Sequence, residues 1–295
     1  DGTRRRAVVL KISVIVPVFN TAQYIDRCVN ALLNQDYSRS DYEVIAVDNG
    51  SSDDSLQRLA RYPVKVVQEA RRGSYAARNS GIREAGGAML AFTDSDCAPR
   101  PGWLRAIEKG LSEPGRLVVQ GKRRLAARSN LMQAINDYEI AKDAYTLSGD
   151  NAMKYYGFTN NMGMHREAYD RFGPFVERDR GADTIFVRTV VDGASCEAVA
   201  FCPDMVIDHL EMNRFRDYLE KMYIYGRSRK RYRHIMRTEA LDFSDRYSIY
   251  RSVIRDSAYS PWLKTSMSAA LGLSIASWQM GSWYGSAETA LGVKR

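Results

Sequence analysis

The sequence predicts an α/β fold with a mostly parallel central sheet flanked by helices, followed by a helical C-terminal extension. Apolar, strand-like runs alternate with helix-like segments through the first hundred residues. This alternation is typical of parallel strands joined by right-handed crossovers. Asp94 and Asp96 directly follow one such run, and open α/β sheets bind ligands at the carboxyl ends of their strands. Beyond residue 212 the alternation stops and basic residues accumulate.

The first half contains four predicted strands, at residues 12–18, 43–47, 63–67 and 88–93. The first is rich in β-branched residues and ends near Pro17, where a missing backbone donor is tolerated. A helix follows it, because Ile25, Cys28, Val29 and Leu32 recur at helical spacing. A second predicted helix carries residues 56 and 59, and a third runs from 73 to 82 and ends before two glycines.

The second half is less regular. We expect a strand at 117–120, helices at 131–145 and 182–191, a short strand at 205–207 and a long basic helix at 215–237. Residues 158–166 are rich in glycine and asparagine and are interpreted as a connector. The predicted division is a flexible segment at 1–10, a nucleotide-sugar-binding half at 11–120, an acceptor-binding half at 121–212, and a basic helical region at 213–295.

Composition narrows the class of protein. An apolar content of 45% and a charged content of 26% over 295 residues are typical of a folded soluble protein. The four cysteines fit neither a zinc-site spacing nor a disulfide framework, which favours free thiols in a reducing compartment. No signal-peptide pattern opens the sequence. We therefore expect a cytoplasmic protein.

The Asp94-Ser95-Asp96 triplet is the strongest chemical signal in the first half. Two carboxylates one residue apart on a loop can converge on one hard cation and hold a diphosphate beside it. A solvated turn is the alternative. The glycine fingerprint of dinucleotide folds and the phosphate loop of nucleotide hydrolases are both absent from the sequence.

Five motifs together carry a resemblance to a known family. They are Ser-Val-Ile-Val-Pro-Val-Phe-Asn at 13–20, Val-Asp-Asn-Gly-Ser-Ser-Asp at 47–53, Ala-Ala-Arg-Asn-Ser-Gly-Ile at 76–82, Asp-Ser-Asp at 94–96 and Pro-Gly-Trp-Leu at 101–104. From residue 11 to about 230 the chain resembles the inverting family 2 glycosyltransferases with the GT-A fold. The resemblance implies a hexosyltransferase-type enzyme that moves a sugar from a nucleoside-diphosphate donor to an acceptor hydroxyl, with Mn²⁺ or Mg²⁺.

The resemblance also implies roles at the donor and metal sites. Asp96 would bind the metal directly and Asp94 through the ribose or a metal-bound water. His209 would be a third metal ligand, or else a structural histidine. The implied nucleotide-binding set is Pro17, Val18, Asn20, Asp48, Asn49, Arg78, Asp94 and Ser95.

Asn49 departs from the family pattern, which usually has two carboxylates at positions 48 and 49. A carboxamide oxygen can accept the N3 proton of uracil, but the same group also carries two donors. Uridine is therefore the first expectation for the donor base and thymidine the second. Arg78 suits a diphosphate, or acts by orienting a neighbouring carboxylate.

The resemblance implies that Asp183 is the general base that deprotonates the acceptor. The family has a Glu-Asp pair here, whereas this chain has Ala182 before Asp183. An aspartate that only caps a helix is the alternative. Asn160 and Asn161 resemble a loop near the donor sugar and acceptor, with turn formation as their alternative role. The resemblance implies that Ala182 also contacts the donor sugar or acceptor.

The C-terminal region favours a membrane surface as a partner. Six basic residues lie from Arg227 to Arg237. Such a run can bind anionic lipid, a pyrophosphate or nucleic acid, or simply form a solvated helix face. Residues 267–283 are apolar but interrupted by serines and glycines, which favours an interfacial or docking helix over a membrane span. We expect peripheral attachment to the inner face of the cell membrane, with nucleic acid an unlikely partner.

The expected role is therefore polysaccharide or glycolipid assembly, with a saccharide or lipid-linked saccharide as acceptor. Two other functions are alternatives. A sugar nucleotidyltransferase would carry a glycine-rich basic loop after the first strand, where this chain has Phe19-Asn20-Thr21-Ala22. A catalytically silent glycosyltransferase-like membrane scaffold would have no need of Asp94, Asp96 and Asp183.

Overall fold

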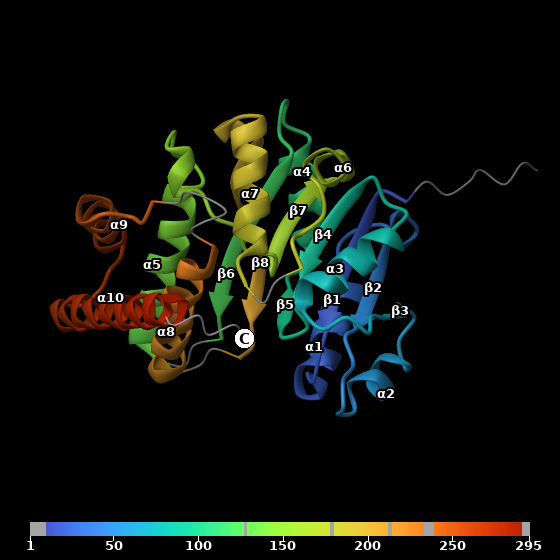
Figure 1. The fold of residues 1–295 in the computed structure, drawn as a ribbon, viewed down its shortest axis with the longest axis horizontal. Helices are drawn as coiled ribbons and strands as arrows, with labels where there is room; N and C mark the ends of the chain where they lie inside the picture. The colour runs from blue at the N-terminus through green and yellow to red at the C-terminus, as the bar shows by residue number, and fades with distance from the viewer. Residues whose placement is uncertain (1–9, 127–128, 178–179, 212–213, 233–238, 291–295) are drawn as a thin grey trace, which may run out of the picture.

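The computed structural model describes residues 10–126, 129–177, 180–211, 214–232 and 239–290. A central sheet is flanked by helices on both faces, and a group of helices stands against one end of it (Figure 1). The strands are β1 Ile12–Val18, β2 Tyr42–Asp48, β3 Lys65–Gln68, β4 Met89–Thr93, β5 Cys97–Pro99, β6 Val118–Leu125, β7 Asn161–His165 and β8 Val199–His209. The helices are α1 Ala22–Leu33, α2 Ser55–Leu59, α3 Ser74–Arg83, α4 Trp103–Leu111, α5 Asn130–Thr146, α6 Arg166–Phe172, α7 Ala182–Gly193, α8 Phe215–Tyr232, α9 Phe243–Asp256 and α10 Pro261–Ala290.

The sheet has the strand order β3-β2-β1-β4-β7-β6-β8-β5. Neighbours from β3 to β4 are parallel, and so are β6 and β8, as expected for a mostly parallel sheet. β7 is antiparallel to both β4 and β6, and β5 is antiparallel to β8. The predicted boundary after residue 120 falls inside β6, and the division into four segments remains a proposal.

The core around the sheet forms two clusters, one on each face, because alternate strand residues point in opposite directions. Two smaller clusters join α5 to the C-terminal helices. In β1, Ile15 enters one cluster while Val14 and Val16 enter the other. The helical spacing predicted for α1 is confirmed, since Ile25, Cys28, Val29 and Leu32 are its buried residues.

β7 corrects the prediction of a connector at residues 158–166. The segment Asn-Met-Gly-Met-His lacks the β-branched residues that favour strands, so its place in the sheet comes from tertiary packing. Met162 and Met164 are completely buried. Gly163 lies under α4, where an added Cβ would stand 2.6 Å from the Ile107 side chain. A strand with no side chain at this point is what allows the helix to sit close to the sheet.

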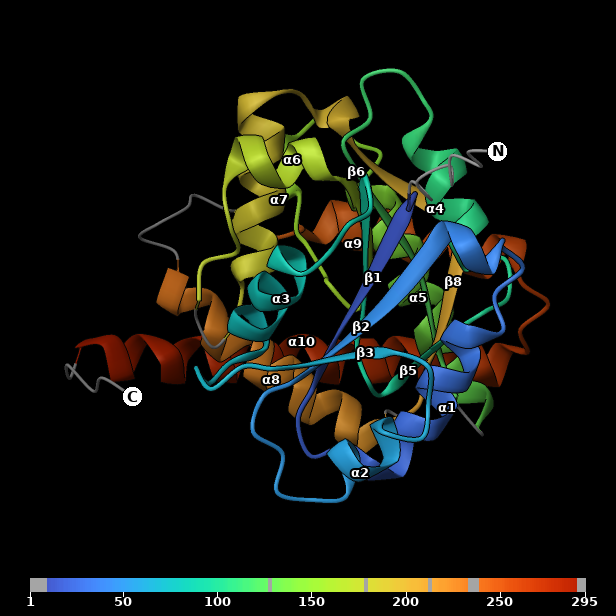
Figure 2. The ribbon, with the colours of Figure 1, turned by 90° about the vertical axis from the view of Figure 1, so that its right-hand side faces the viewer.

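The C-terminal helices pack on one another and on α5. The helix predicted at 215–237 is observed as α8, and residues 233–238 lie outside the described residues. The apolar segment 267–283 lies within the longer α10. In Figure 2, α10 is seen along its length with α8 beside it. None of the helices in the described part of the chain is both long enough and apolar enough to cross a membrane.

Glycines bring the backbones of α8 and α10 into contact. A Cβ added to Gly226 would lie 1.9 Å from the carbonyl oxygen of Trp278, and one added to Gly281 would lie 2.0 Å from that of Tyr223. Because backbone atoms cannot move aside as a flexible side chain can, these positions tolerate no side chain without separating the helices.

We expect Gly281→Ala to lower the free energy of unfolding by about 1–3 kcal/mol, the usual cost of overpacking. Gly272→Ala on the same helix is the matched control, because no atom lies within 4 Å of the added Cβ. That control should gain up to about 1 kcal/mol from helix propensity. The thermal unfolding midpoint measures both. Equal midpoints for the two variants would contradict the close contact between α8 and α10.

Candidate functional site

The carboxyl ends of β1, β2 and β4 converge at one edge of the sheet, as the sequence predicts for the ligand site. Register pairing places Pro17 and Val18 beside Val47 and Asp48, and β4 on the other side of β1 ends just before Asp94. Pro17, Val18, Asn49, Arg78, Asp94, Ser95 and Asp96 all line one cleft there.

Arg78 links the two acidic parts of the site. It projects from α3, is 3% exposed, and donates from Nη2 to Asp94 Oδ1. Its guanidinium lies 5.3 Å from the centre of the Tyr75 ring, and its charge opposes the rise that burial causes in the pKa of Asp183. Arg78 therefore lies between the nucleotide end of the cleft and the predicted base.

Asn49 and Asn20 hold the loops that shape the nucleotide end. The Asn49 amide donates to the carbonyl oxygens of Glu69 and Arg71 at 2.8 and 2.7 Å, and its Oδ1 accepts from Gly73 at 2.8 Å. Asn20, at a left-handed φ of 51°, accepts from the Ser52 backbone at 2.8 Å. Both side chains thus have backbone partners already, and their contacts with a nucleotide stay predictions.

Asp48 is 5% exposed and accepts from the backbone N–H groups of Gly50 and Ser51, at 3.2 and 3.3 Å. These bonds close the turn after β2. Asp48 is not among the described residues that line the cleft, so its predicted contact with a base likewise stays a prediction.

β5 and β8 bring together a cluster of possible metal ligands. Cys97 pairs with His209 in the antiparallel register, and the Leu210 N–H donates to the Asp96 carbonyl at 2.9 Å. As a result, His209 Nε2 lies 3.7 Å from Asp96 Oδ2. The ligand atoms of Asp96, Cys97 and His209 all lie within 4.8 Å of one another.

Asp96 and His209 offer a carboxylate and an imidazole that can hold a divalent cation such as Mn²⁺, whereas burial raises the pKa of the Cys97 thiol and disfavours the thiolate that would bind a metal. Burial raises the pKa of Asp96, and the neighbouring His209 opposes that rise. The Glu211 N–H donates to His209 Nδ1 at 3.4 Å. Coordination of a cation through Nε2 requires a lone pair on that atom, so the imidazole proton would have to be on Nδ1 and this hydrogen bond would be lost.

Asp183 is in the first turn of α7, where its Oδ1 accepts from the Thr184 N–H at 2.9 Å. Gly181, at a φ of 90°, allows the turn that starts the helix. Gly157 packs against it, since a Cβ there would lie 2.3 Å from the Asp183 carbonyl oxygen. The close approach of these loops fixes the carboxylate at the cleft wall.

Two effects act on the pKa of Asp183 in opposite directions. A helix N-terminus stabilises the charged form of an aspartate and would lower its pKa. In the structure, burial raises the pKa, and this outweighs the Thr184 hydrogen bond, the Arg78 charge and the Tyr75 hydroxyl, which lower it. The raised pKa makes this carboxylate a stronger base than an exposed aspartate.

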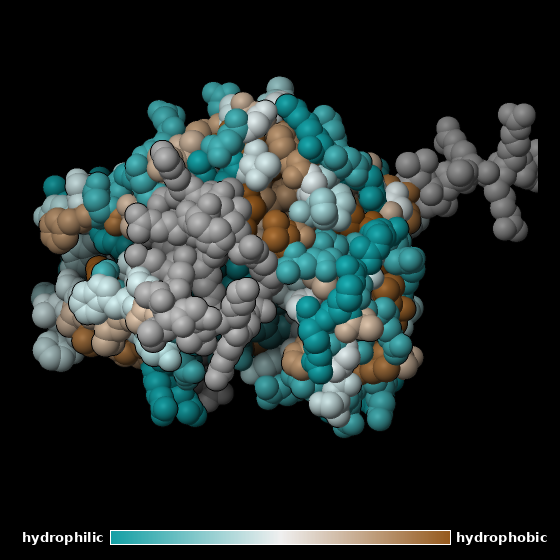
Figure 3. Space-filling view, in the orientation of Figure 1, coloured by the Kyte–Doolittle hydropathy of each residue, from teal (hydrophilic) through white to brown (hydrophobic). Residues whose placement is uncertain are grey.

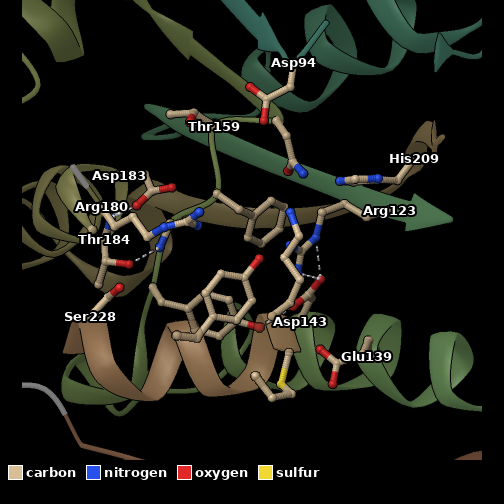
Figure 4. A pocket seen from close by; sticks show the side chains of 18 of the residues that line it. Asp94, Arg123, Glu139, Asp143, Thr159, Arg180, Asp183, Thr184, His209 and Ser228 are labelled. Atoms are coloured by element: carbon tan, nitrogen blue, oxygen red, sulfur yellow. Dashed lines mark hydrogen bonds and ion pairs between the residues drawn. The ribbon is translucent and has the colours of Figure 1, made fainter. Parts of the chain in front are cut away.

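The cleft has a volume of about 800 Å³ and extends well past these groups. In Figure 4, Asp183 and Arg180 lie on one side of it and His209 and Arg123 on the other. Its far part is lined by α5, α8 and α10. The lining residues from these helices include Asn136, Tyr138, Glu139, Lys142, Asp143, Tyr218, Lys221, Met222, Tyr225, Leu271, Ser274, Ile275 and Trp278.

Asn161 and Ala182, like Asn20 and Asp48, are not among the described residues that line the cleft. Asn161 is completely buried at the start of β7, donates to the carbonyls of Lys122 and Met205, and accepts from the Trp103 indole at 2.8 Å. Ala182 is completely buried in the core. The prediction that they contact the donor sugar or acceptor is therefore corrected, because packing uses both. Asn160 does line the cleft.

Sequence reasoning missed the polar wall opposite Asp183. Arg123 donates from Nε and Nη2 to Asp143 Oδ2, and Tyr156 donates its hydroxyl to Asp143 Oδ1. Asp143 is 1% exposed, so the pair is held in a fixed place. A signal was present: Asn136, Glu139 and Asp143 recur at helical spacing on α5, where a core-facing helix would carry apolar residues.

Comparison with known proteins places these features in a family. The family model described as Glycosyl transferase family 2 matches residues 13–174, more than half of the chain. Glycosyltransferase AglE of Haloferax volcanii is 28% identical over 239 residues, which cover 73% of this chain and 72% of AglE. Several other curated glycosyltransferases are matched over half of their length or less.

Solved structures share the fold. The mannosyltransferase PcManGT from Pyrobaculum calidifontis, in complex with GDP-Man and Mn²⁺, superposes with a TM-score of 0.59 at 22% identity, covering 97% of this chain and 76% of PcManGT. S. aureus TarS 1-349 in complex with UDP-GlcNAc gives 0.54 at 20% identity, covering 91% and 81%. At this level of identity the likeness shows the GT-A fold alone.

The raised pKa of Asp183 predicts a pH-dependent cost in stability. Because the folded-state pKa exceeds the unfolded value, stability is lost as pH rises from the unfolded to the folded pKa. Asp183→Asn should therefore gain stability relative to the wild type as pH rises from 4 to 8. Each pKa unit corresponds to about 1.4 kcal/mol, or roughly 2–4 °C in Tm.

Thermal unfolding across that pH range measures this effect. Asp204→Asn, which removes an exposed carboxylate from β8, is the control for loss of a charge. A constant difference between Asp183→Asn and the wild type at all pH values would show that burial does not raise this pKa.

Proposed function

The chain belongs to glycosyl transferase family 2 and is a glycosyltransferase, and from this premise we propose the reaction that it catalyses. This reaction is the metal-dependent transfer of a sugar from a nucleoside-diphosphate donor to an acceptor hydroxyl, with inversion at the anomeric carbon. The observation that supports it most is the meeting of Asp96 and His209 at the nucleotide end of a cleft whose wall carries Asp183.

The donor diphosphate would lie between the cation cluster and Arg78. Asp96 and His209 would hold Mn²⁺ or Mg²⁺, with Asp94 reaching the ribose or a metal-bound water. The cation supplies Lewis-acid stabilisation to the leaving diphosphate. Arg78, fixed by its bond to Asp94, would add a positive charge in a partly buried site, where charges interact more strongly than in water.

Asp183 would act as the general base. The acceptor hydroxyl gives its proton to the Asp183 carboxylate while its oxygen forms the new bond to the anomeric carbon. The bond from that carbon to the diphosphate oxygen breaks on the opposite face, and the nucleoside diphosphate leaves with the electron pair. Asp183 has a raised pKa, and proton transfer to a positioned base is most efficient when its pKa is near the working pH.

For the donor base, uridine remains first and thymidine second. The similar structures do not narrow the choice, since PcManGT holds GDP-Man and TarS holds UDP-GlcNAc. For the acceptor we propose a saccharide or lipid-linked saccharide in polysaccharide or glycolipid assembly. The far part of the cleft gives such an acceptor room beyond the donor site. We propose that the enzyme works at the inner face of the cell membrane, attached peripherally through its C-terminal region.

Calorimetric titration with UDP, dTDP, GDP and CMP, each with Mn²⁺ and again with EDTA, tests the donor proposal. We expect one diphosphate to bind with Mn²⁺ and to lose most of its affinity in EDTA. Asp96→Asn should lower the affinity for Mn²⁺ and remove this difference. Affinity for that diphosphate that is unchanged by EDTA would contradict the metal site, and failure of all four to bind would contradict the donor class.

Asp183→Asn tests the base. Loss of general base catalysis should lower the rate of nucleoside-diphosphate release from the matching sugar donor by about 10²- to 10⁴-fold. Diphosphate binding with Mn²⁺ should stay close to that of the wild type, because Asp183 lies outside the cation cluster. A normal transfer rate in the folded variant would mean that another group accepts the proton.

A further inference from the structure

The outer face of α10 carries a continuous exposed stripe without a single charged residue. Its members follow one another at steps of one, three or four residues, so they share one side of the helix. The largest are strongly exposed: Trp262 by 79%, Trp283 by 65%, Leu273 by 55% and Met280 by 54%. The full stripe is Trp262, Thr265, Ala269, Gly272, Leu273, Ala276, Met280, Trp283 and Ala287. It is about 37 Å long at 1.5 Å per residue.

The stripe is not a face that the fold itself covers. The opposite side of α10 is the one pressed against α8 through Gly281 and Gly285, and its buried residues include Met267 and Ala270. The atoms over α10, at the lower left of Figure 3, are mainly pale to brown, the colours of neutral and apolar residues. Contiguous apolar surface of this length is unusual on a soluble protein and marks an interaction site.

The whole net charge of the protein lies in the region that contains α10. Residues 213–295 include fifteen basic and seven acidic residues, a balance of +8. The remaining 212 residues have 28 of each sign. The catalytic part is therefore neutral, and an anionic surface would attract this protein by its C-terminal region.

Charge and shape favour a lipid surface over a second copy of the chain. A pair of copies joined along α10 would bring two regions of +8 together, which is electrostatically unfavourable. The stripe is also one helix wide, whereas stable protein interfaces are broad patches of about 800 Å² on each partner. A bilayer accepts such a helix lying in its plane, and tryptophan side chains such as Trp262 and Trp283 prefer the interface between lipid and water.

The same helix borders the catalytic cleft. Leu271, Ser274, Ile275 and Trp278 line the cleft from α10, and Ile275 is 41% exposed. A surface that holds the stripe would thus lie next to a wall of the cleft. An acceptor anchored in that surface could reach the cleft without leaving the lipid.

We propose that α10 is a docking helix that lies in the plane of an anionic membrane with this stripe towards the lipid. The cleft beside it then receives a lipid-linked acceptor directly from that membrane. This inference rests on the proposed function for the identity of the acceptor. The docking surface itself is independent of catalysis and can be tested without any donor.

Flotation with vesicles of phosphatidylcholine, with and without 30% phosphatidylglycerol, tests the docking surface. We expect the full chain to float with the anionic vesicles, and less so at high salt, because the electrostatic part is screened. Trp262→Ser/Trp283→Ser should weaken binding about tenfold or more, since it removes two large side chains from the lipid. Val66→Ser/Val176→Ser, which removes two exposed apolar side chains elsewhere, should bind like the wild type.

Quenching of tryptophan fluorescence by brominated lipids is a second test of contact with the membrane. Fluorescence of the wild type should fall on contact with anionic brominated vesicles, and the double tryptophan variant should lose most of that response. Trp103 is completely buried and reports that the fold is intact. Equal flotation of the wild type and the double tryptophan variant would overturn the proposal. So would a stable dimer in lipid-free sedimentation that the same substitutions abolish, because the stripe would then be an interface between copies.

Diphosphate binding with Mn²⁺, measured on the same samples, separates this proposal from the proposed function. Vesicle binding without diphosphate binding would leave the docking helix in place and reject the donor chemistry. Diphosphate binding without vesicle binding would reject the docking helix alone.

Discussion

The pairing of β5 with the end of β8 is the constraint on which the rest of the site depends. It joins residues more than a hundred positions apart, so that Asp96 from the first half of the chain meets His209 from the second. The contact is made by backbone hydrogen bonds, including that from Leu210 to the Asp96 carbonyl. The sheet therefore brings the two residues together, and the fold would preorganise the proposed cation site.

Buried charged groups are a second feature of the site, and removing them from water lowers the stability of the fold. Arg78 is buried and Arg123 is partly buried, and each forms an ion pair with one aspartate, Asp94 and Asp143. Asp183 lies near Arg78 and accepts a hydrogen bond from the Tyr75 hydroxyl, but burial still raises its pKa. Burying such charged groups lowers the free energy of unfolding. Charged groups on the walls of one cleft suit a catalytic site, because the burial that lowers stability also strengthens the electrostatic interactions of each charge.

The sequence predicted the elements up to β4 closely because their signals are local, but it did not predict β5 and α4, which follow before residue 120. Strand β1 ends near Pro17, and the apolar residues of α1 recur at helical spacing, so neither needs knowledge of a partner. β7 could not be found this way, since Met162 and Met164 gain their place only from β4 and β6 on either side. The meeting of Asp96 and His209 also depends on a distant pairing, and chain order could suggest it but not establish it. The role of Asn161 was predicted wrongly, and the polar face of α5 was missed, for the same reason. In both cases the role depends on which surfaces the fold places opposite these residues.

The glycine contact between α8 and α10 has a consequence for which acceptors can react. Helices that touch backbone to backbone leave little freedom for α10 to roll or tilt against the body of the protein. With the outer face of α10 on a membrane, the carboxylate of Asp183 would then stand at a set height above the lipid head groups. Acceptors would be selected by how far their reactive hydroxyl projects from the membrane, so that the length of a growing glycan, as well as its chemical identity, would decide whether it is extended.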